Sequence, residues 1–225
     1  MTWSAGVRRA LAVVAHPDDE SFGLGGLLDE LVRRGAEVSV LCFTHGEAST
    51  LHGCDGGLAA VRAAELDAAA AILAVSQTRL LDYPDGALSR IPVPELAARV
   101  RELAGELHPT HLMAFDEGGI TGHPDHVQAT RAALAAASEL NLPVFGWALP
   151  QAVASALNTE YGTSFIGRPD HQIDWELTVD RGRQRRAIAA HRSQSTGNPV
   201  LLRRLELLGN REHVRILRIR DQARG

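Results

Sequence analysis

Two kinds of hydrophobic pattern alternate along the chain. Residues 11–15 form a short, continuously apolar and partly β-branched run, which is typical of a strand buried on both faces of a parallel sheet. Between residues 22 and 34 the apolar side chains recur at helical spacing, and Gly35 follows as a helix-ending glycine. The same criteria predict further strands at residues 38–43, 79–81, 111–115, 144–148 and 173–179. They predict further helices at residues 59–74, 94–107, 125–140 and 181–191.

Because strands and helices alternate with short connections, the sequence predicts a three-layer α/β fold with a mainly parallel sheet. The chain contains no internal repeat and no low-complexity linker, so we expect residues 1–225 to form a single domain. In such sheets the ligand lies in the crevice beyond the carboxyl ends of the strands. The residues that follow the predicted strands are therefore the first candidates for a functional site.

Composition and charge exclude several classes of protein. Of the 225 residues, 45% are hydrophobic and 22% are charged, as in an ordinary globular protein, and the net charge is −4. The acidic balance, with no sustained basic run, argues against nucleic acid as a partner. The apolar runs are well short of the roughly 20 residues that cross a bilayer, and we find no signal peptide. We therefore expect a cytoplasmic protein without a membrane span.

Two residue types narrow the chemistry. The 23 basic residues are all Arg. The absence of Lys excludes a P-loop lysine and a Schiff-base lysine, including that of pyridoxal-phosphate enzymes. The Arg and Ala usage fits a GC-rich bacterial genome. The two cysteines, Cys42 and Cys54, cannot make a disulfide framework or a four-thiolate zinc site, which agrees with a reducing compartment.

The tripeptide His-Pro-Asp occurs twice, each time after a predicted strand. Residues 16–20 read His-Pro-Asp-Asp-Glu directly after the first strand, and residues 123–126 read His-Pro-Asp-His after the strand at 111–115 and a loop. Either motif alone could be a capped helix start, with Asp18 or Asp19 as the N-cap. Their recurrence at two strand ends of one α/β domain favours a metal site built from imidazole and carboxylate ligands.

The spacing within the two motifs indicates how roles could be divided. In a helical first turn His16 and Asp19 lie on one face, so both can bind a catalytic zinc, which needs three protein ligands and one open position. The third ligand is either His123 or His126, and the other histidine is then free to hydrogen-bond or to transfer protons. Asp18 is adjacent to a ligand but points differently, so it can take a proton from the attacking water.

Further short motifs accompany these two runs. They are Phe-Thr-His-Gly-Glu at 43–47, Arg-x-x-Glu at 62–65, Pro-Asp-Gly at 84–86 and His-x-Ser-Gln at 191–194. Together with Ala-His-Pro-Asp-Asp-Glu and Gly-His-Pro-Asp-His, in this order, they resemble the LmbE/PIG-L family of zinc-dependent N-deacetylases, which act mainly on N-acetylglucosamine conjugates. The resemblance extends over most of the chain and implies a Rossmann-like, LmbE-like fold.

The resemblance also implies roles for individual residues. It implies three ligands for Zn²⁺, or for Fe²⁺ in the cell, namely His16, Asp19 and His126. Asp18 would be the general base, and His123, as an imidazolium, would stabilise the oxyanion or protonate the departing amine. Some members have a tyrosine two residues before the first histidine of the second motif, where this chain has Thr121. That departure removes a phenolic group from this position.

Arg62 and Asp85 are the candidate substrate-binding residues. The Arg62 guanidinium suits a sugar hydroxyl or a phosphate, and the alternative is an i,i+3 ion pair with Glu65 on a solvated helix face. Asp85 can accept hydrogen bonds from sugar hydroxyls, or it can simply belong to an Asp-Gly turn. His45 and His191 are weaker candidates that could support the metal ligands.

The sequence therefore predicts a zinc-dependent hydrolase that removes the N-acetyl group from a small amino-sugar conjugate. An amidase of thiol conjugates such as mycothiol adducts would use the same chemistry, and the sequence does not separate the two. A third interpretation is a sugar-binding module without turnover, against which the full set of metal and acid–base residues argues. The resemblance is also compatible with a homo-oligomer, since some relatives form trimers or hexamers.

Overall fold

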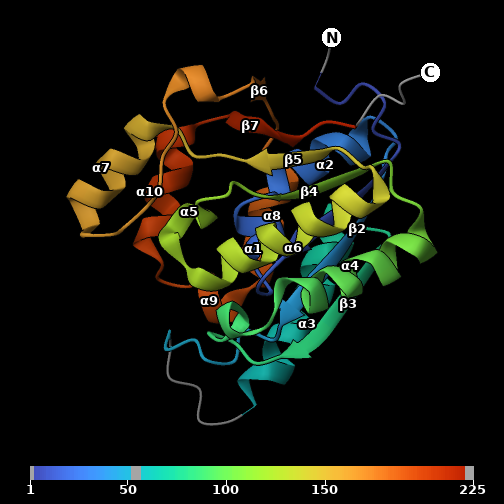
Figure 1. Cartoon of the computed structure of the whole chain (residues 1–225). Coiled ribbons are helices and arrows are strands. Elements are labelled where there is room, and N and C mark those ends of the chain that lie inside the picture. The colour runs from blue at the N-terminus through green and yellow to red at the C-terminus, as the bar shows by residue number, and fades with distance from the viewer. Residues whose placement is uncertain (1–2, 52–56, 221–225) are drawn as a thin grey trace.

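A seven-stranded sheet lies at the centre of the computed structural model, which describes residues 3–51 and 57–220 (Figure 1). The strands are β1 (Arg9–Val14), β2 (Glu37–Thr44), β3 (Gln77–Tyr83), β4 (His111–Phe115), β5 (Val144–Trp147), β6 (Trp175–Thr178) and β7 (Arg211–Arg218). Their order is β3-β2-β1-β4-β5-β7-β6. Strands β1 to β5 pair in parallel, whereas β7 is antiparallel to β5 and β6. The predicted α/β fold with a mainly parallel sheet is confirmed. Cys54 lies outside the described residues.

Strand β1 is central in the sheet and packs on both faces, which explains its unbroken apolar sequence. Its even-numbered residues belong to one hydrophobic core, together with the leucines of helix α2 (Gly25–Arg33). Its odd-numbered residues belong to a second core on the opposite face, with apolar residues of α4 (Val93–Leu107) and α6 (Pro124–Leu140). Two cores separated by one sheet are the three layers that the sequence predicts.

Helices cover both faces of the sheet (Figure 1). On the side of α2 lie α3 (Leu58–Leu73) and α8 (Gly182–Ala190), which contact each other. On the other side α4 packs against α6, whose small buried side chains allow a close approach to the sheet; they are Ala132, Ala133, Ala136 and Ala137. Helices α7 (Gln151–Tyr161) and α10 (Pro199–Leu208) pack together at one end of the sheet.

Short elements complete the described structure. They are α1 (Asp19–Phe22), α5 (Gly119–Gly122), α9 (Arg192–Ser195) and the 3-10 turns η1 (Leu88–Arg90) and η2 (Asp170–Gln172). None of the described helices combines the length and the apolar character that crossing a membrane requires.

The structure differs from the prediction in two main places. The helix predicted at residues 22–34 is two helices, α1 and α2, interrupted at Gly23, where an added Cβ would collide with the Phe115 ring. The patterns also predict nothing at residues 151–161 or after residue 191, where α7, α10 and β7 form. Strand β7 is rich in Arg and lacks the continuous apolar run of the parallel strands, because it pairs with its neighbours in antiparallel fashion near the edge of the sheet.

Candidate metal centre and its pocket

The carboxyl end of β1 leads directly into the site. The backbone N–H groups of Ala15 and His16 both donate to Asp19 Oδ2, over 3.1 and 3.0 Å. Asp18, which lies between His16 and Asp19 in the sequence, has a φ of 118°, in the left-handed region that side-chain-bearing residues avoid. This tight turn, and not the helical first turn that the sequence predicts, brings His16 and Asp19 side by side.

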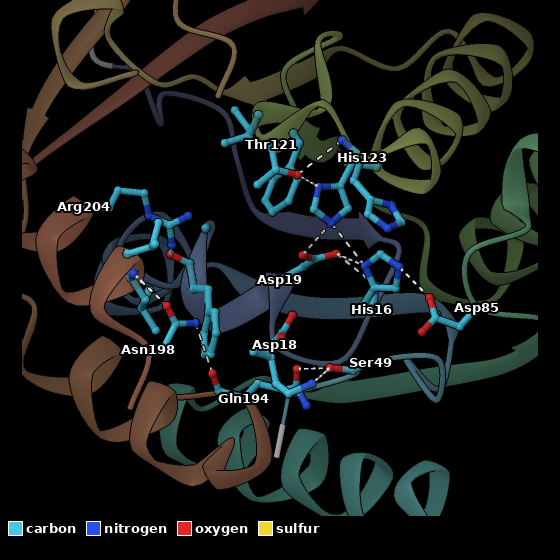
Figure 2. Close-up of a pocket in the computed structure, with 18 of the residues that line it drawn as sticks. His16, Asp18, Asp19, Ser49, Asp85, Thr121, His123, Gln194, Asn198 and Arg204 are labelled. Carbon is cyan, nitrogen blue, oxygen red and sulfur yellow. Dashed lines mark hydrogen bonds and ion pairs between the residues drawn. The ribbon is translucent and has the colours of Figure 1, made fainter. Parts of the chain in front are cut away.

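Helix α6 brings His126 to the same point. Its Nε2 lies 3.2 Å from His16 Nδ1 and 3.2 Å from Asp19 Oδ1, and His16 Nδ1 lies 3.7 Å from Asp19 Oδ2. All three side chains are buried. Figure 2 shows the His16 ring between the carboxylates of Asp19 and Asp85. Of the two histidines that the sequence offers as a third ligand, His126 is the one that faces both His16 and Asp19.

The outward ring nitrogens of both histidines already have partners. His16 Nε2 lies 3.0 Å from Asp85 Oδ1 and 3.6 Å from Asp125 Oδ2, and His126 Nδ1 donates to Gly119 O over 2.9 Å. These acceptors take the N–H of each outward nitrogen, so the inward nitrogens, 3.2 Å apart, are directed at each other and at the Asp19 carboxylate. A cation bound between them would be shared by both rings and the carboxylate. The donor set therefore fits a divalent metal ion.

His16, His123 and Asp125 form a second group of potential ligands, with donor atoms within 4.8 Å of one another. The Asp125 carboxylate, however, accepts hydrogen bonds from two backbone N–H groups of residues 86–88, over 2.8 and 3.0 Å. It thereby fastens the Pro-Asp-Gly turn to the start of α6. Asp19, in contrast, receives both of its backbone hydrogen bonds on Oδ2. Its Oδ1 remains directed at His126. The three residues His16, Asp19 and His126, which we call the metal group, are therefore the better fit for a metal ion.

His123 caps helix α6 and lines the pocket. Its Nδ1 accepts a hydrogen bond from Asp125 N over 3.2 Å, so Nε2 carries the N–H of the neutral ring. Burial lowers the pKa of His123 below its usual value, which favours a neutral ring that donates through Nε2. The imidazolium role that the resemblance implies stays a prediction. Thr121 Oγ1 lies 3.2 Å from His126 Nδ1 and supports this loop.

Asp18 is held beside the metal group by Arg62. Arg62 Nη2 donates to Asp18 Oδ2 over 3.0 Å and to Pro17 O, and Nη1 donates to Gly46 O over 2.6 Å. Burial raises the pKa of Asp18 to about 6, against the lowering effect of the Arg62 charge. Arg62 is 3% exposed, so the alternative of an ion pair with Glu65 on a solvated helix face is wrong. Its contacts make Arg62 a positioning residue, and direct binding of substrate stays a prediction.

Asp85, the other predicted substrate-binding residue, lies against the metal group. Its Oδ1 orients the His16 ring, and its Oδ2 accepts from Ala48 N over 2.8 Å. These contacts draw the loop after β2 onto the site. Asp85 and Arg62 both line the pocket. The contacts of Asp85 nonetheless support its neighbours, and binding of a sugar hydroxyl stays a prediction.

The two weaker histidine candidates have different surroundings. His191 Nε2 lies 2.6 Å from Glu20 Oε1 in the protein interior, and Glu20 Oε2 accepts from Asp18 N over 2.9 Å. His191 thus supports the turn that carries Asp18. His45 Nε2 lies 2.9 Å from Asp82 Oδ1, and His45 is not among the described residues that line the pocket.

The metal group opens into a pocket of about 350 Å³. The wall far from Asp85 carries Gln194, Asn198 and Arg204 (Figure 2). Aromatic side chains also line it, namely Phe22, Phe115, Trp147 and Phe165. Asn198 and Arg204 are not among the candidates predicted from the sequence, because α10 follows no predicted strand. The one signal in that region was the His-x-Ser-Gln motif, which contains Gln194.

Comparisons with known proteins show the family of this chain and its fold. Residues 11–137, more than half of the chain, match the PIG-L family, described as GlcNAc-PI de-N-acetylase. A 1D-myo-inositol 2-acetamido-2-deoxy-alpha-D-glucopyranoside deacetylase of Mycolicibacterium vanbaalenii is 31% identical over 233 residues, which cover 85% of this chain and 82% of that protein. A protein of the same name from Salinispora arenicola is 34% identical over 181 residues, which cover 66% of this chain and 58% of that protein. The chain thus matches less than two thirds of that relative's length.

A solved structure shares the fold. The deacetylase in a complex with teicoplanin, from the biosynthesis pathway of teicoplanin, superimposes with a TM-score of 0.73 at 21% identity, covering 95% of this chain and 99% of that one. The similarity therefore covers nearly all of both chains. On the strength of the family match and of the relative matched over most of its length, this chain belongs to the PIG-L family of LmbE-like proteins.

Proposed function

We propose that this protein is a zinc-dependent N-deacetylase that removes the acetyl group from an N-acetylglucosamine-type conjugate. The observation that carries the proposal is the convergence of two imidazole nitrogens and the Asp19 carboxylate beside a second buried carboxylate, Asp18. The names of the relatives, which are deacetylases of a 2-acetamido-2-deoxyglucoside, support the choice of substrate class.

His16, Asp19 and His126 would hold the ion. Two nitrogen ligands and one carboxylate, without a thiolate, suit Zn²⁺ in a catalytic site, and Fe²⁺ would accept the same donors. When bound, the ion supplies Lewis acidity for the amide carbonyl and for the attacking water. The carboxylates of Asp85 and Asp125 fix the His16 ring from behind, which keeps its inward nitrogen directed at the site.

Asp18 is the proposed general base. With a pKa raised to about 6 by burial, its carboxylate is ionised at neutral pH yet more basic than an exposed aspartate. It takes a proton from water as the water oxygen bonds to the acetamide carbon. The same proton can then pass to the nitrogen as the carbon–nitrogen bond breaks, which leaves acetate and an amine. Arg62 holds the carboxylate in place through Oδ2.

His123 is the proposed donor to the oxyanion. Its neutral ring carries the N–H on Nε2, because Nδ1 is occupied by the helix cap. A neutral donor fixed in a buried pocket stabilises developing negative charge without having to be protonated first. Thr121, which stands where some family members have tyrosine, holds the loop beside it.

The test is metal analysis combined with an activity assay on the purified protein. We expect about one zinc ion per chain, release of a primary amine from N-acetylglucosamine glycosides, loss of that activity on chelation and recovery on addition of Zn²⁺. His126→Ala should lose both metal and activity, and the exposed His171→Ala should keep both. Amine release that persists without any metal, or a metal-loaded protein that releases no amine from such glycosides, would refute the proposal.

A further inference from the structure

Arg204 is a buried cation on the pocket wall opposite the metal group. It projects from α10, is 7% exposed and lines the same pocket as Asp18 and Asp19. Figure 2 shows it beside Asn198, across the pocket from Asp85. None of the steps proposed for deacetylation uses it, so its presence at this position needs a separate explanation.

The Arg204 charge has no direct counter-ion among the described residues. Nη2 donates to Phe22 O over 2.8 Å, Nε is buried without a hydrogen-bond partner, and no described carboxylate lies within ion-pair distance. The neighbouring buried arginine, Arg181, is paired directly with Glu212. Although burial lowers the pKa of Arg204 to about 10, its guanidinium remains charged at neutral pH. The charge of Glu212 favours the Arg204 guanidinium without a direct ion pair between them. A buried charge without a direct partner is costly to the fold.

Arg204 is also held in a fixed position. The centre of its guanidinium lies 5.4 Å from the centre of the Trp147 ring, which favours a cation over the ring face. Trp147 is itself fixed, because its Nε1 donates to Glu212 Oε2 over 2.6 Å. A ligand that binds Arg204 therefore finds the side chain already ordered, which lowers the entropic cost of binding.

The other polar groups on this wall are largely occupied by the protein itself. Asn198 Oδ1 accepts from Leu201 N over 3.0 Å, and Asn198 Nδ2 donates to Gln194 O over 3.2 Å. Gln194 Oε1 accepts from Ser49 Oγ over 2.8 Å. Arg204 has five N–H donors, of which one is used for a described hydrogen bond. It is therefore the group on this wall with the most unused donor capacity.

We propose that Arg204 binds an anionic group, a carboxylate or a phosphate, on the part of the substrate away from the acetamide. The planar guanidinium matches both anions in geometry and charge. Aromatic side chains that line the pocket, such as Phe22 and Phe115, suit the apolar face of a sugar ring. The inference rests on the proposed function and narrows it, since it assigns the enzyme an acidic amino-sugar conjugate.

The first test compares substrates that differ in charge. The probes are methyl N-acetylglucosaminide, N-acetylmuramic acid, which carries a carboxylate, and N-acetylglucosamine 6-phosphate. The wild-type enzyme should show a lower KM for one of the anionic probes than for the neutral one, and the better of the two identifies the anion. Arg204→Gln should raise that KM about 10- to 100-fold, as loss of a charge-assisted hydrogen bond predicts, and leave kcat and the neutral KM within about twofold.

Two further variants separate binding from structure. Arg203→Gln removes the same charge from the adjacent residue of α10, which faces outward and pairs with Glu160, and it should change none of these constants. Arg204→Lys keeps the charge but loses the planar set of N–H donors of the guanidinium. Its KM for the anionic probe should therefore lie between those of the wild type and Arg204→Gln. Equal losses on neutral and anionic probes in Arg204→Gln, or a wild type without preference for either anion, would overturn the proposal.

A binding measurement tests whether Arg204 binds an anionic group even if no probe is turned over. Titration calorimetry with N-acetylglucosamine 6-phosphate and N-acetylmuramic acid on chelated, metal-free protein reports on Arg204 without the metal chemistry. One of them should bind the wild type and Arg203→Gln alike and bind Arg204→Gln at least about tenfold more weakly. Absence of binding, or equal binding to Arg204→Gln, refutes the anion site. Binding without turnover would refute the deacetylase proposal alone.

Discussion

At the scale of single residues, the site depends on side chains that fix one another. The Asp18 carboxylate accepts from Arg62, its backbone N–H donates to Glu20, and Glu20 is paired with His191 in the interior. These contacts hold Asp18 at a positive φ that an isolated aspartate would leave. The backbone strain therefore has a use, because it directs Asp18 and Asp19 to different parts of the same centre.

Asp18→Asn tests the assignment of the general base. The amide has nearly the same shape but cannot accept the proton of water, so kcat should fall about 10²- to 10⁴-fold. Zinc content should stay that of the wild type, because Asp18 is not one of the three residues that fit the ion. Steady-state kinetics and elemental analysis check this, with the exposed Asp170→Asn as the control. Unchanged kcat in the Asp18→Asn variant would show that another group takes the proton.

At the scale of elements, four loops that follow parallel strands build the site. The turn after β1 supplies Asp18 and Asp19, and the loop after β2 supplies the Gly46 carbonyl that holds Arg62. The turn after β3 supplies Asp85, and the segment between β4 and α6 leads to His126. Because parallel strands end at one edge of the sheet, residues far apart in sequence meet there. The loop conformations then decide which atoms face the metal.

Gly46→Ala tests how closely the loop after β2 fits Arg62. Gly46 has a φ of +66°, and an added Cβ would collide with the Arg62 guanidinium. Gly35→Ala is the matched control, because Gly35 has a φ of +83° with no atom near the added Cβ. Both variants should lose about 1–2 kcal/mol of unfolding free energy to backbone strain. Only Gly46→Ala should also lower kcat, about tenfold or more, by displacing Arg62 and Asp18. Equal kcat in the two variants would contradict the positioning role of Arg62.

Asp116, just beyond β4, joins three segments of the chain. It is almost fully buried, accepts from Arg168 over 2.8 Å and is also paired with Arg215 of β7. Asp116→Asn leaves two arginines without their shared counter-ion, so the free energy of unfolding at pH 7 should fall by about 3 kcal/mol or more. Urea denaturation measures the difference, with Asp170→Asn as the exposed control.

The difference in unfolding free energy between the wild type and Asp116→Asn should depend on pH. Burial opposes ionisation of Asp116, but Arg168 and Arg215 outweigh it and lower the pKa of the carboxyl in the folded protein. The ion pairs therefore stabilise the fold fully above the unfolded pKa of about 3.9, and the stabilisation is lost as the pH falls through the lower, folded pKa. The difference between wild type and Asp116→Asn should be constant from about pH 7 to about pH 5 and should shrink below about pH 4. A difference that grows on acidification would contradict this.

At the scale of the whole molecule, the metal group and the pocket beside it combine elements that are distant in the chain. His16 and Asp19 belong to the first strand and its turn, His126 belongs to a helix of the opposite layer, and Arg204 comes from the C-terminal segment. The pocket therefore exists only when both halves of the sheet are assembled. A ligand bound there stabilises the complete fold over its parts.

Zinc should accordingly raise the unfolding temperature. At a free zinc concentration about 100 times the dissociation constant, binding adds about 2.7 kcal/mol. For a chain of this size we expect an increase in Tm of about 5 °C or more. His126→Ala should abolish the increase and His171→Ala should retain it, as measured by circular dichroism on metal-free and zinc-loaded samples. An increase that persists in His126→Ala would place the stabilising ion elsewhere.

The amino-acid pattern along the chain is sufficient to predict the parallel core of the sheet and the residues that meet at its edge. Continuous apolar runs such as residues 11–15 identify strands buried on both faces, and the polar motifs that follow them must share one edge, because parallel strands are aligned in direction. Local spacing also predicts His16 beside Asp19, although the helical turn assumed there is a tight turn with Asp18 at a positive φ. These features depend on neighbours along the chain, which the sequence displays directly.

The completion of the site depends on contacts between segments that are distant in the chain. The tertiary structure directs His126 Nε2 at His16, assigns Nδ1 of His123 to the helix cap, and places Arg62 in the interior, where its donors reach Pro17 and Gly46. It also brings Arg204 to the pocket from α10, a helix whose sequence carries no sign of a site. Ring orientation, burial and hydrogen-bond partners depend on packing between distant segments, and no local pattern in the chain records which segments will meet.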